Sequence, residues 1–240
     1  MKTRLTWTYA HVTATSETAK TSVTALRKRL ADETDDEAKP LFRFSSTILA
    51  AKPETKAASK LSAAEIGIAH HTFQQHVDIA RTATGLDLRN EAQGLFEAGI
   101  LTEAQFQALN ISDLEAFWQS KVGAALRKIS PAAINREMEF TARLSSADAK
   151  TLPALKLNPS LTTDDFVVVQ GQVDLAVILP EEIWLLDFKT DAVDETGLVD
   201  KVKQYAPQLT TYACALEKIY KRPVTQCWLH FLRARKTLEL

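Results

Sequence analysis

The chain has few cysteines and no apolar run of membrane length, and each absence excludes a class of protein. Cys214 and Cys227 are the only cysteines among 240 residues, so a four-cysteine iron–sulfur cluster is excluded. So low a count is typical of a reducing cytoplasm. No stretch approaches the length of a membrane span, and no signal peptide opens the chain. We therefore expect a cytoplasmic globular protein with no membrane partner.

A charge imbalance and a nucleotide-binding loop are absent as well. The net charge is −1, which does not favour strong general binding to nucleic acid, and the basic runs Arg27–Arg29 and Arg233–Lys236 are typical of solvated faces. No G-x-x-x-x-G-K-[ST] pattern occurs, so we expect no ATP site in this chain. With 45% hydrophobic and 25% charged residues, the composition suits one globular domain, with or without a helical insert.

What the chain does contain is a pair of carboxylates on a predicted β-hairpin. Residues Val167–Leu179 are rich in β-branched side chains, Ile183–Lys189 is a second apolar run, and the turn signal Pro180–Glu182 separates them. A hairpin folded at this turn places Asp174 and Asp187 nearly opposite each other. Two carboxylates this close repel unless a cation lies between them. Oxygen ligands suit Mg²⁺ or Mn²⁺, so the pattern predicts a metal site.

Side chains on a strand alternate between the two faces of a sheet. We therefore expect Asp174 to share a face with Gln172 and Ala176, and Asp187 to share one with Lys189. A bound metal would activate water for attack on a phosphate, and Lys189 would orient that water or neutralise the growing charge. A D-x-K triplet alone is more often a surface strand with a salt bridge. Here it ends a very apolar strand, where buried charges without a function would be costly.

A helical pattern follows the hairpin, over Gly197–Tyr220. Pro207 is expected to mark its first turn or a kink. Gln208 and Tyr212 lie four residues apart and therefore on one face of the helix. Taken alone, this pair also fits the edge of an ordinary amphipathic helix. After a metal-binding hairpin, it predicts a helix that grips a phosphate backbone.

These patterns, in this order, resemble a known family. The G-x-x-D pattern at Gly171, the D-x-K pattern at Asp187 and the Q-x-x-x-Y pattern at Gln208 are similar to the RecB-type nuclease module, a branch of the PD-(D/E)xK superfamily. Arg136–Phe140 resembles the R-E-x-x-F strand of that module, and Gly67–His71 resembles its upstream G-x-x-x-H helix. Each motif is weak alone, but their common order is fairly specific.

The beginning of the chain extends the resemblance over nearly its whole length. Leu5–Tyr9, followed by Lys20–Thr24, is similar to the approach to the nuclease domain in AddA-type helicase–nuclease subunits. The resemblance therefore favours a C-terminal domain excised from a longer helicase–nuclease chain. It implies further helicase domains in the parent chain and an AddB-like partner subunit. The two cysteines argue against the iron–sulfur branch of the family, so we expect no such cluster.

The resemblance assigns roles residue by residue. It implies a Mg²⁺ or Mn²⁺ site whose ligands are His71, Asp174, Asp187 and the backbone carbonyl of Phe188. Lys189 would be the catalytic lysine. Gln208 and Tyr212 would support the site and contact DNA, and Glu137 would be an accessory acid near the metal.

The neighbouring histidines leave an ambiguity. His70 and His71 point about 100° apart on a helix, so only one can face the site. Counting four residues on from Gly67 favours His71. We interpret His11, His76 and His230 as ordinary packed or solvated residues.

The order of elements predicts the fold class. Capping patterns at Ser62, Thr102 and Ser112 start helices, Ser22–Asp32 is a short basic helix, and strands begin at Asn135 and end with one at 224–232. We expect an α/β protein with a restriction-endonuclease-like core, in which helices flank a mixed central sheet, and an N-terminal helical region. Residues 1–60 would be an approach segment, 61–130 a helical block carrying the upstream histidine, and 131–240 the core. Together they would form one nuclease domain.

The expected function is that of a metal-dependent DNA nuclease. In the resembled family, such a domain trims single strands that a helicase delivers during double-strand break repair. One alternative is a non-catalytic DNA-binding or assembly domain that keeps the fold, and another is a free-standing phage-type exonuclease. The sequence leaves open the cleavage polarity and the choice between exonuclease and endonuclease action.

Overall fold

The structure is a computed structural model that describes residues 20–30, 61–152, 155 and 166–240. The Leu5–Tyr9 motif and His11 lie outside the described residues, and so do the side chains of Arg27–Arg29.

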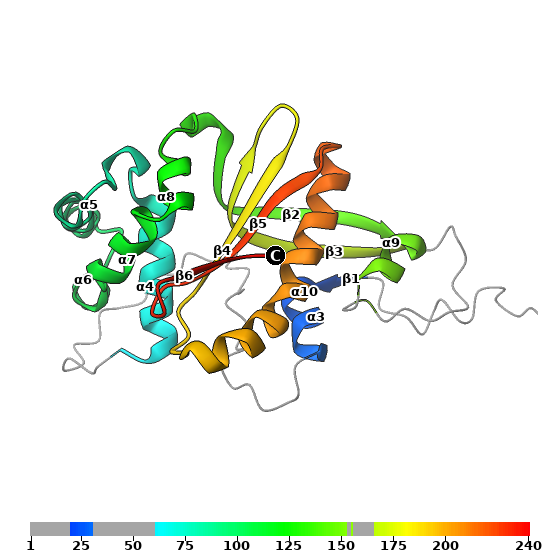
Figure 1. Ribbon diagram of the computed structural model, residues 1–240, viewed down its shortest axis with the longest axis horizontal. Coiled ribbons are helices and arrows are strands. Elements are labelled where there is room, and N and C mark those ends of the chain that lie inside the picture. Colours follow the sequence, from blue (N-terminus) through cyan, green and yellow to red (C-terminus); the bar gives the residue numbers. More distant parts are fainter. Residues whose placement is uncertain (1–19, 31–60, 153–154, 156–165) are drawn as a thin grey trace, which may run out of the picture.

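Six strands of the described residues form one mixed sheet (Figure 1). They are β1 (Lys20–Ser22), β2 (Ile134–Ser145), β3 (Phe166–Ile178), β4 (Ile183–Lys189), β5 (Val224–Phe231) and β6 (Lys236–Glu239). The order is β1-β3-β4-β5-β6. Strand β2 pairs with the edge of β3 that lies opposite β1 and β4. Strand β1 is parallel to β3, and β4 is parallel to β5, whereas the other neighbours are antiparallel. The expected hairpin is confirmed, with Leu175 opposite Leu186.

Helices flank this sheet, as expected. They are α3 (Val23–Leu30), α4 (Ala63–His76), α5 (Gly85–Glu97), α6 (Glu103–Ala108), α7 (Ile111–Trp118), α8 (Lys121–Leu126), α9 (Ser146–Thr151) and α10 (Glu195–Tyr220), with short 3-10 turns η1 (Ile79–Arg81) and η2 (Pro131–Ala133). Helices α4 to α8 gather at one end of the molecule, whereas α10 and α3 lie together against the sheet (Figure 1).

Two of the three predicted capping patterns start helices in the structure. Ser62 and Thr102 each form the expected capping box, because the side chain three residues later returns a hydrogen bond to the backbone of the cap. The prediction at Ser112 is wrong. Helix α7 begins at Ile111 with Asn110 as its cap, and Glu115 instead accepts a hydrogen bond from the backbone N–H of Gly85, 2.8 Å away. The carboxylate of Glu115 therefore binds a backbone group distant in the sequence, and not the backbone of Ser112 as a capping box would require.

Helix α10 is longer at its start than the sequence pattern indicates. Its N-cap is Asp194, whose carboxylate accepts from the N–H of Gly197. Pro207 lies inside the helix and not in its first turn. The helix changes direction along its length (Figure 1), as expected where a proline cannot donate to the preceding turn.

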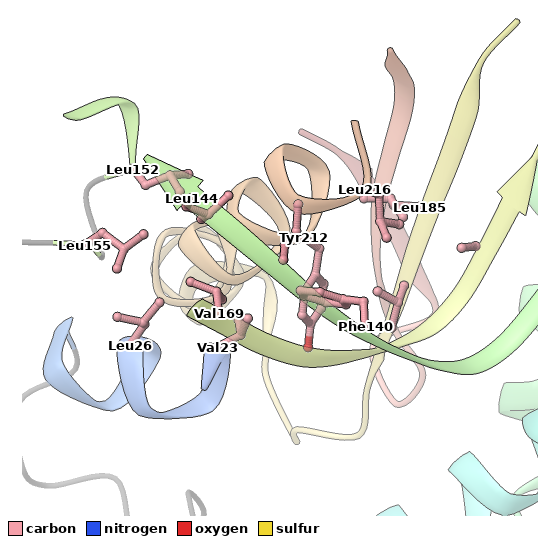
Figure 2. Packing of buried hydrophobic residues seen from close by; sticks show 14 of the residues in the cluster. Val23, Leu26, Phe140, Leu144, Leu152, Leu155, Val169, Leu185, Tyr212 and Leu216 are labelled. Carbon is pink, nitrogen blue, oxygen red and sulfur yellow. The ribbon is translucent and has the colours of Figure 1, made fainter. Parts of the chain in front are cut away.

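Two large apolar cores lie on opposite faces of the sheet. Under α10 and α3, residues such as Val23, Val169 and Leu216 pack together (Figure 2). The helical block covers the other core, which includes Phe73 and Phe188. Within the described residues, no helix is long and apolar enough to cross a membrane.

Candidate metal centre

The β3–β4 hairpin opens at the expected carboxylate. The last paired residues are Leu175 and Leu186, and one step further the side chain of Asp174 replaces a backbone partner. Its Oδ2 accepts a hydrogen bond of 2.7 Å from the backbone N–H of Phe188. This bond fixes the direction of the carboxylate at the end of the hairpin, next to Asp187.

Glu137 lies across from Asp174 on the other neighbouring strand. The flanking pairs, Arg136 with Leu175 and Met138 with Val173, define this position. Glu137 has a φ of +49°, in the left-handed region that non-glycine residues rarely adopt. Such strain of about 1–3 kcal/mol persists where the surroundings impose it, often at functional sites. The side-chain amide of Gln172 donates to the carbonyl of Glu137 over 3.1 Å and helps to hold this conformation.

The simple alternation expected along β3 does not hold at this point. Val173 and Ala176, three residues apart, both pack in the core under α10, whereas Leu175 and Val177 belong to the other core. The strand therefore changes faces at Asp174, beside the left-handed residue of β2. As a result, Asp174 lies where the two sides of the sheet meet.

Helix α4 brings His71 to these carboxylates. Its Nδ1 lies 3.6 Å from Asp174 Oδ2 and 3.7 Å from Glu137 Oε1. Gly67, one turn earlier, explains the close approach of this helix to the end of β4, since a Cβ there would lie 2.9 Å from the hydroxyl oxygen of Thr190. One ligand atom from each of His71, Glu137 and Asp174 lies within 4.8 Å of the others. An imidazole and two carboxylates at this spacing are suited to a divalent cation.

His70 is engaged elsewhere. Its Nδ1 donates to the carbonyl of Ile66 over 2.8 Å, and its Nε2 accepts from the backbone N–H of Asn110 over 3.1 Å. Burial lowers the pKa of His70, which agrees with a neutral ring that uses both nitrogens. The count from Gly67 therefore selected the histidine that faces the carboxylates.

Asp187 and Lys189 lie beside this group, toward α10. The Nζ of Lys189 is 2.6 Å from Asp187 Oδ2, and both side chains are largely buried. The other oxygen of Asp187 accepts from Gln208 over 3.1 Å, and Gln208 also donates to the hydroxyl of Tyr212 over 2.8 Å. The Q-x-x-x-Y pattern thus reaches the hairpin through a chain of hydrogen bonds.

The glycine of the G-x-x-D pattern makes room for this chain. A Cβ on Gly171 would lie 2.7 Å from carbons of the Phe140 ring and 2.9 Å from the Tyr212 ring. The two rings meet edge to face at 5.6 Å (Figure 2). Phe140 from the R-E-x-x-F strand therefore holds Tyr212 against the backbone of β3, and Tyr212 holds Gln208.

A second layer, which the sequence analysis missed, supports the lysine. Lys189 Nζ lies 4.4 Å from the centre of the Tyr205 ring, at a distance typical of a cation–π contact. The hydroxyl of Tyr205 donates to Asp191, and Asp191 also pairs with Lys201 over 2.8 Å. Tyr205 precedes Gln208 by three residues, so helical spacing was a signal that indicated the same face.

The charges of the site are tightly coupled. Burial alone would lower the pKa of His71, but the carboxylates of Asp174 and Glu137 outweigh it and raise that pKa to about 9. Burial, opposed by Lys189 and reinforced by Asp174, raises the pKa of Asp187 to about 6. Burial also raises the pKa of Asp174. Without a metal, the protonated imidazole of His71 is a cation that the carboxylates of Asp174 and Glu137 attract.

The structure thus brings all the predicted side chains together, with one difference in their grouping. Glu137, expected to be an accessory acid, lies with His71 and Asp174. Asp187, expected to be a ligand, directs its oxygens to Lys189 and Gln208. The left-handed conformation of Glu137 has no local sequence signal, since glutamate is not a residue that favours it.

The chain is similar in sequence to known proteins. Residues 40–239 match the family described as the PD-(D/E)XK nuclease superfamily. The chain belongs to this superfamily. Among curated relatives, it is 31% identical over 238 residues to the A subunit of the ATP-dependent helicase/nuclease of Listeria innocua. The A subunits of the same name from Bacillus cytotoxicus and Clostridium acetobutylicum are 30% and 29% identical over 244 residues.

The match covers nearly all of this chain but a small part of each relative. It spans 97% of the chain and 18% of the Listeria innocua protein, and 100% of the chain and 19% of the Clostridium acetobutylicum protein. The chain therefore corresponds to only a small part of the length of these relatives.

The two neighbouring histidines are expected to respond differently to substitution. His71→Ala should weaken Mn²⁺ binding about 10-fold or more, since it removes a nitrogen that faces both carboxylates. His70→Ala should leave Mn²⁺ affinity nearly unchanged but lower the melting temperature, because the N–H of Asn110 loses its acceptor. Calorimetric titration and thermal unfolding of both variants test this. The opposite pattern would move the site to His70.

Proposed function

We propose that this chain is a Mg²⁺- or Mn²⁺-dependent deoxyribonuclease domain, and that residues 61–240 with the preceding segment form one nuclease domain. The observation that carries the proposal is the convergence of His71, Glu137 and Asp174 beside the Asp187–Lys189 pair. Superfamily membership supports it independently. A structural salt bridge alone would not require three further ligand atoms at this spacing.

The residues would divide the work of phosphodiester hydrolysis. His71, Asp174, Asp187 and the backbone carbonyl of Phe188 would hold the metal, and the structure adds Glu137 to these candidates. A divalent metal supplies Lewis acidity at the phosphate. Lys189 would orient the attacking water or stabilise negative charge as it develops, while Asp187 and Tyr205 fix the position of its ammonium. Gln208 and Tyr212 would hold Asp187 and contact the DNA backbone.

The names of the relatives support a proposal that this domain is part of a helicase–nuclease protein. Their name, which joins a helicase and a nuclease in one protein, motivates the proposal that this domain cleaves single strands delivered by helicase domains of the same protein, as an exonuclease. An AddB-like partner and a role in double-strand break repair in the cytoplasm belong to the same proposal. The alternative of a non-catalytic assembly domain is disfavoured by the complete set of Asp174, Asp187 and Lys189.

Incubation of the purified chain with end-labelled single- and double-stranded DNA tests the proposal. Cleavage is expected with Mg²⁺ or Mn²⁺ and none with EDTA, and faster loss of the single strand would support the proposed substrate. DNA binding without cleavage under all metal conditions would favour the assembly domain. Cleavage of linear double strands without a helicase would favour a free-standing exonuclease.

Metal affinity is expected to rise with pH. Because the pKa of His71 is raised to about 9, its imidazole is protonated at neutral pH and must lose that proton to bind a metal. Below this pKa, the apparent affinity should fall about tenfold per pH unit while one proton is displaced. Titration with Mn²⁺ between pH 6.5 and 8.5, in buffers of different ionisation enthalpy, measures both the slope and the released proton. A flat profile would contradict ligation by His71.

A further inference from the structure

Arg136 makes a contact that the proposed chemistry does not use. Its Nη1 donates to two backbone carbonyls at the end of helix α4, those of Gln74 at 3.3 Å and Val77 at 2.5 Å. The last four carbonyls of a helix lack partners within the helix, and a cation there is also favoured by the helix dipole. Arg136 is half-buried, and its guanidinium reaches these carbonyls between β2 and α4.

The two ends of this contact carry two of the converging side chains. Gln74 lies three residues after His71 on α4, and Arg136 directly precedes Glu137 on β2. Arg136 therefore ties the helix that presents the imidazole to the strand that presents the carboxylate. Trp118 holds the same turn of α4 from another side, because its indole N–H donates to the side chain of Gln74 over 3.1 Å.

Arg136 also adjoins the strained residue of the site. The left-handed backbone of Glu137 is held on one side by the amide of Gln172. On the other side, Arg136, which directly precedes Glu137, is itself anchored to α4. A shift of α4 away from β2 would move His71 away from Glu137 and Asp174, whose oxygens now lie 3.7 and 3.6 Å from its Nδ1.

We propose that Arg136 is a positioning residue for the metal centre, which sets the separation of His71 from Glu137 and Asp174 by docking the C-terminal turn of α4 on β2. The inference rests on the metal site of the proposed function. It assigns to the arginine of the R-E-x-x-F pattern a role through two other residues, without contact to metal or DNA.

The chain offers a matched control for this role. Arg127 makes the same kind of contact, since its Nη1 donates to the carbonyls of Trp118 at 2.5 Å and Thr82 at 3.4 Å. Trp118 ends α7, and Thr82 follows η1, so Arg127 binds elements that carry none of the proposed ligands and reaches α4 only indirectly, through the indole of Trp118. Loss of either arginine should destabilise the fold, but only loss of Arg136 should disturb the metal centre.

The test compares Arg136→Met, Arg136→Lys and Arg127→Met in the full chain. For each, thermal unfolding without metal and the Mn²⁺ dissociation constant are measured, together with binding of labelled single-stranded DNA in EDTA. We expect Arg136→Met to weaken Mn²⁺ binding by about 10-fold or more, the scale on which groups that orient metal ligands act. Arg136→Lys, which keeps a cation able to donate to a carbonyl, should recover part of that loss. Arg127→Met should lower the melting temperature with Mn²⁺ affinity unchanged.

Several outcomes would overturn the inference. If Mn²⁺ affinity follows melting temperature equally in the Arg127 and Arg136 variants, Arg136 is only a structural residue. If Arg136→Lys loses DNA binding in EDTA with Mn²⁺ affinity intact, the arginine is a phosphate contact. If the unmodified chain binds no Mn²⁺, the metal site of the proposed function fails, and this inference fails with it. If the unmodified chain binds Mn²⁺ and both Arg136 variants bind it with unchanged affinity, only the positioning role of Arg136 is rejected.

Discussion

Asp174→Asn is expected to abolish cleavage while leaving the fold intact. The asparagine keeps the size of the side chain and an oxygen that can accept from the N–H of Phe188, but it removes the charge that attracts a hard cation. The loss of rate should exceed about 100-fold, because a metal-organising group is removed. Single-turnover cleavage and calorimetric titration with Mn²⁺ should both show the loss.

The thermal stability of this variant without metal distinguishes the proposal from misfolding. Burial raises the pKa of Asp174, so its charge is held in the metal-free protein against an unfavourable environment. The melting temperature should therefore stay near that of the unmodified chain. Asp113→Asn is a control, since the side chain of Asp113 is also largely buried but pairs with Arg235. Near-normal cleavage by Asp174→Asn would reject the site.

Lys189→Ala is expected to separate catalysis from binding. Its ammonium contacts Asp187 and the Tyr205 ring, and in the proposed scheme it does not ligate the metal. Loss of a charge donor at the transition state typically costs about 3–4 kcal/mol, or about 100- to 1000-fold in rate. Mn²⁺ and DNA affinity should change far less. Lys189→Arg should restore little, since a planar fork does not replace a compact ammonium.

The structure adds a pH signature to this prediction. Lys189 opposes the burial that raises the pKa of Asp187 to about 6, so without the lysine that pKa should rise further. The residual cleavage of Lys189→Ala should then require a higher pH than that of the unmodified chain. Lys218→Ala serves as the control, because Lys218 makes an ion pair of 2.8 Å with Asp148, which is not one of the proposed site residues. If metal affinity collapses together with cleavage, the lysine has a structural role.

What the sequence could predict depended on how close together the determining residues lie. The hairpin was predictable because its two apolar runs and its turn are adjacent, and α4 because Ser62 and Glu65 cap it locally. The D-x-K spacing likewise placed Asp187 and Lys189 together through strand alternation alone. For the same reason, Gln208 and Tyr212 were predicted on one helical face.

What could not be predicted depended on partners distant in the sequence. The start of α7 was predicted wrongly because Glu115 accepts a hydrogen bond from the backbone N–H of Gly85 and forms no capping box with Ser112. Strand β6 was not expected. The turn before it contains Arg235 at a φ of +53°, a conformation that an arginine in the sequence does not predict. The change of face at Asp174 lies opposite the left-handed Glu137, a neighbour distant in the sequence. These features follow from tertiary contacts that override local preference.

The pairing of β1 with β3 has a consequence for how the chain acquires its structure. Lys20–Ser22 lies parallel to residues 168–170, so the first described strand is joined to a partner most of the chain away. Pairings of this kind close large loops and form slowly. Until β1 arrives, that stretch of β3 presents unpaired backbone groups to other molecules, and an open edge is where strands from separate chains associate. The newly made protein is therefore open to aggregation until β1 pairs with β3, and the pairing of this short strand ends that exposure.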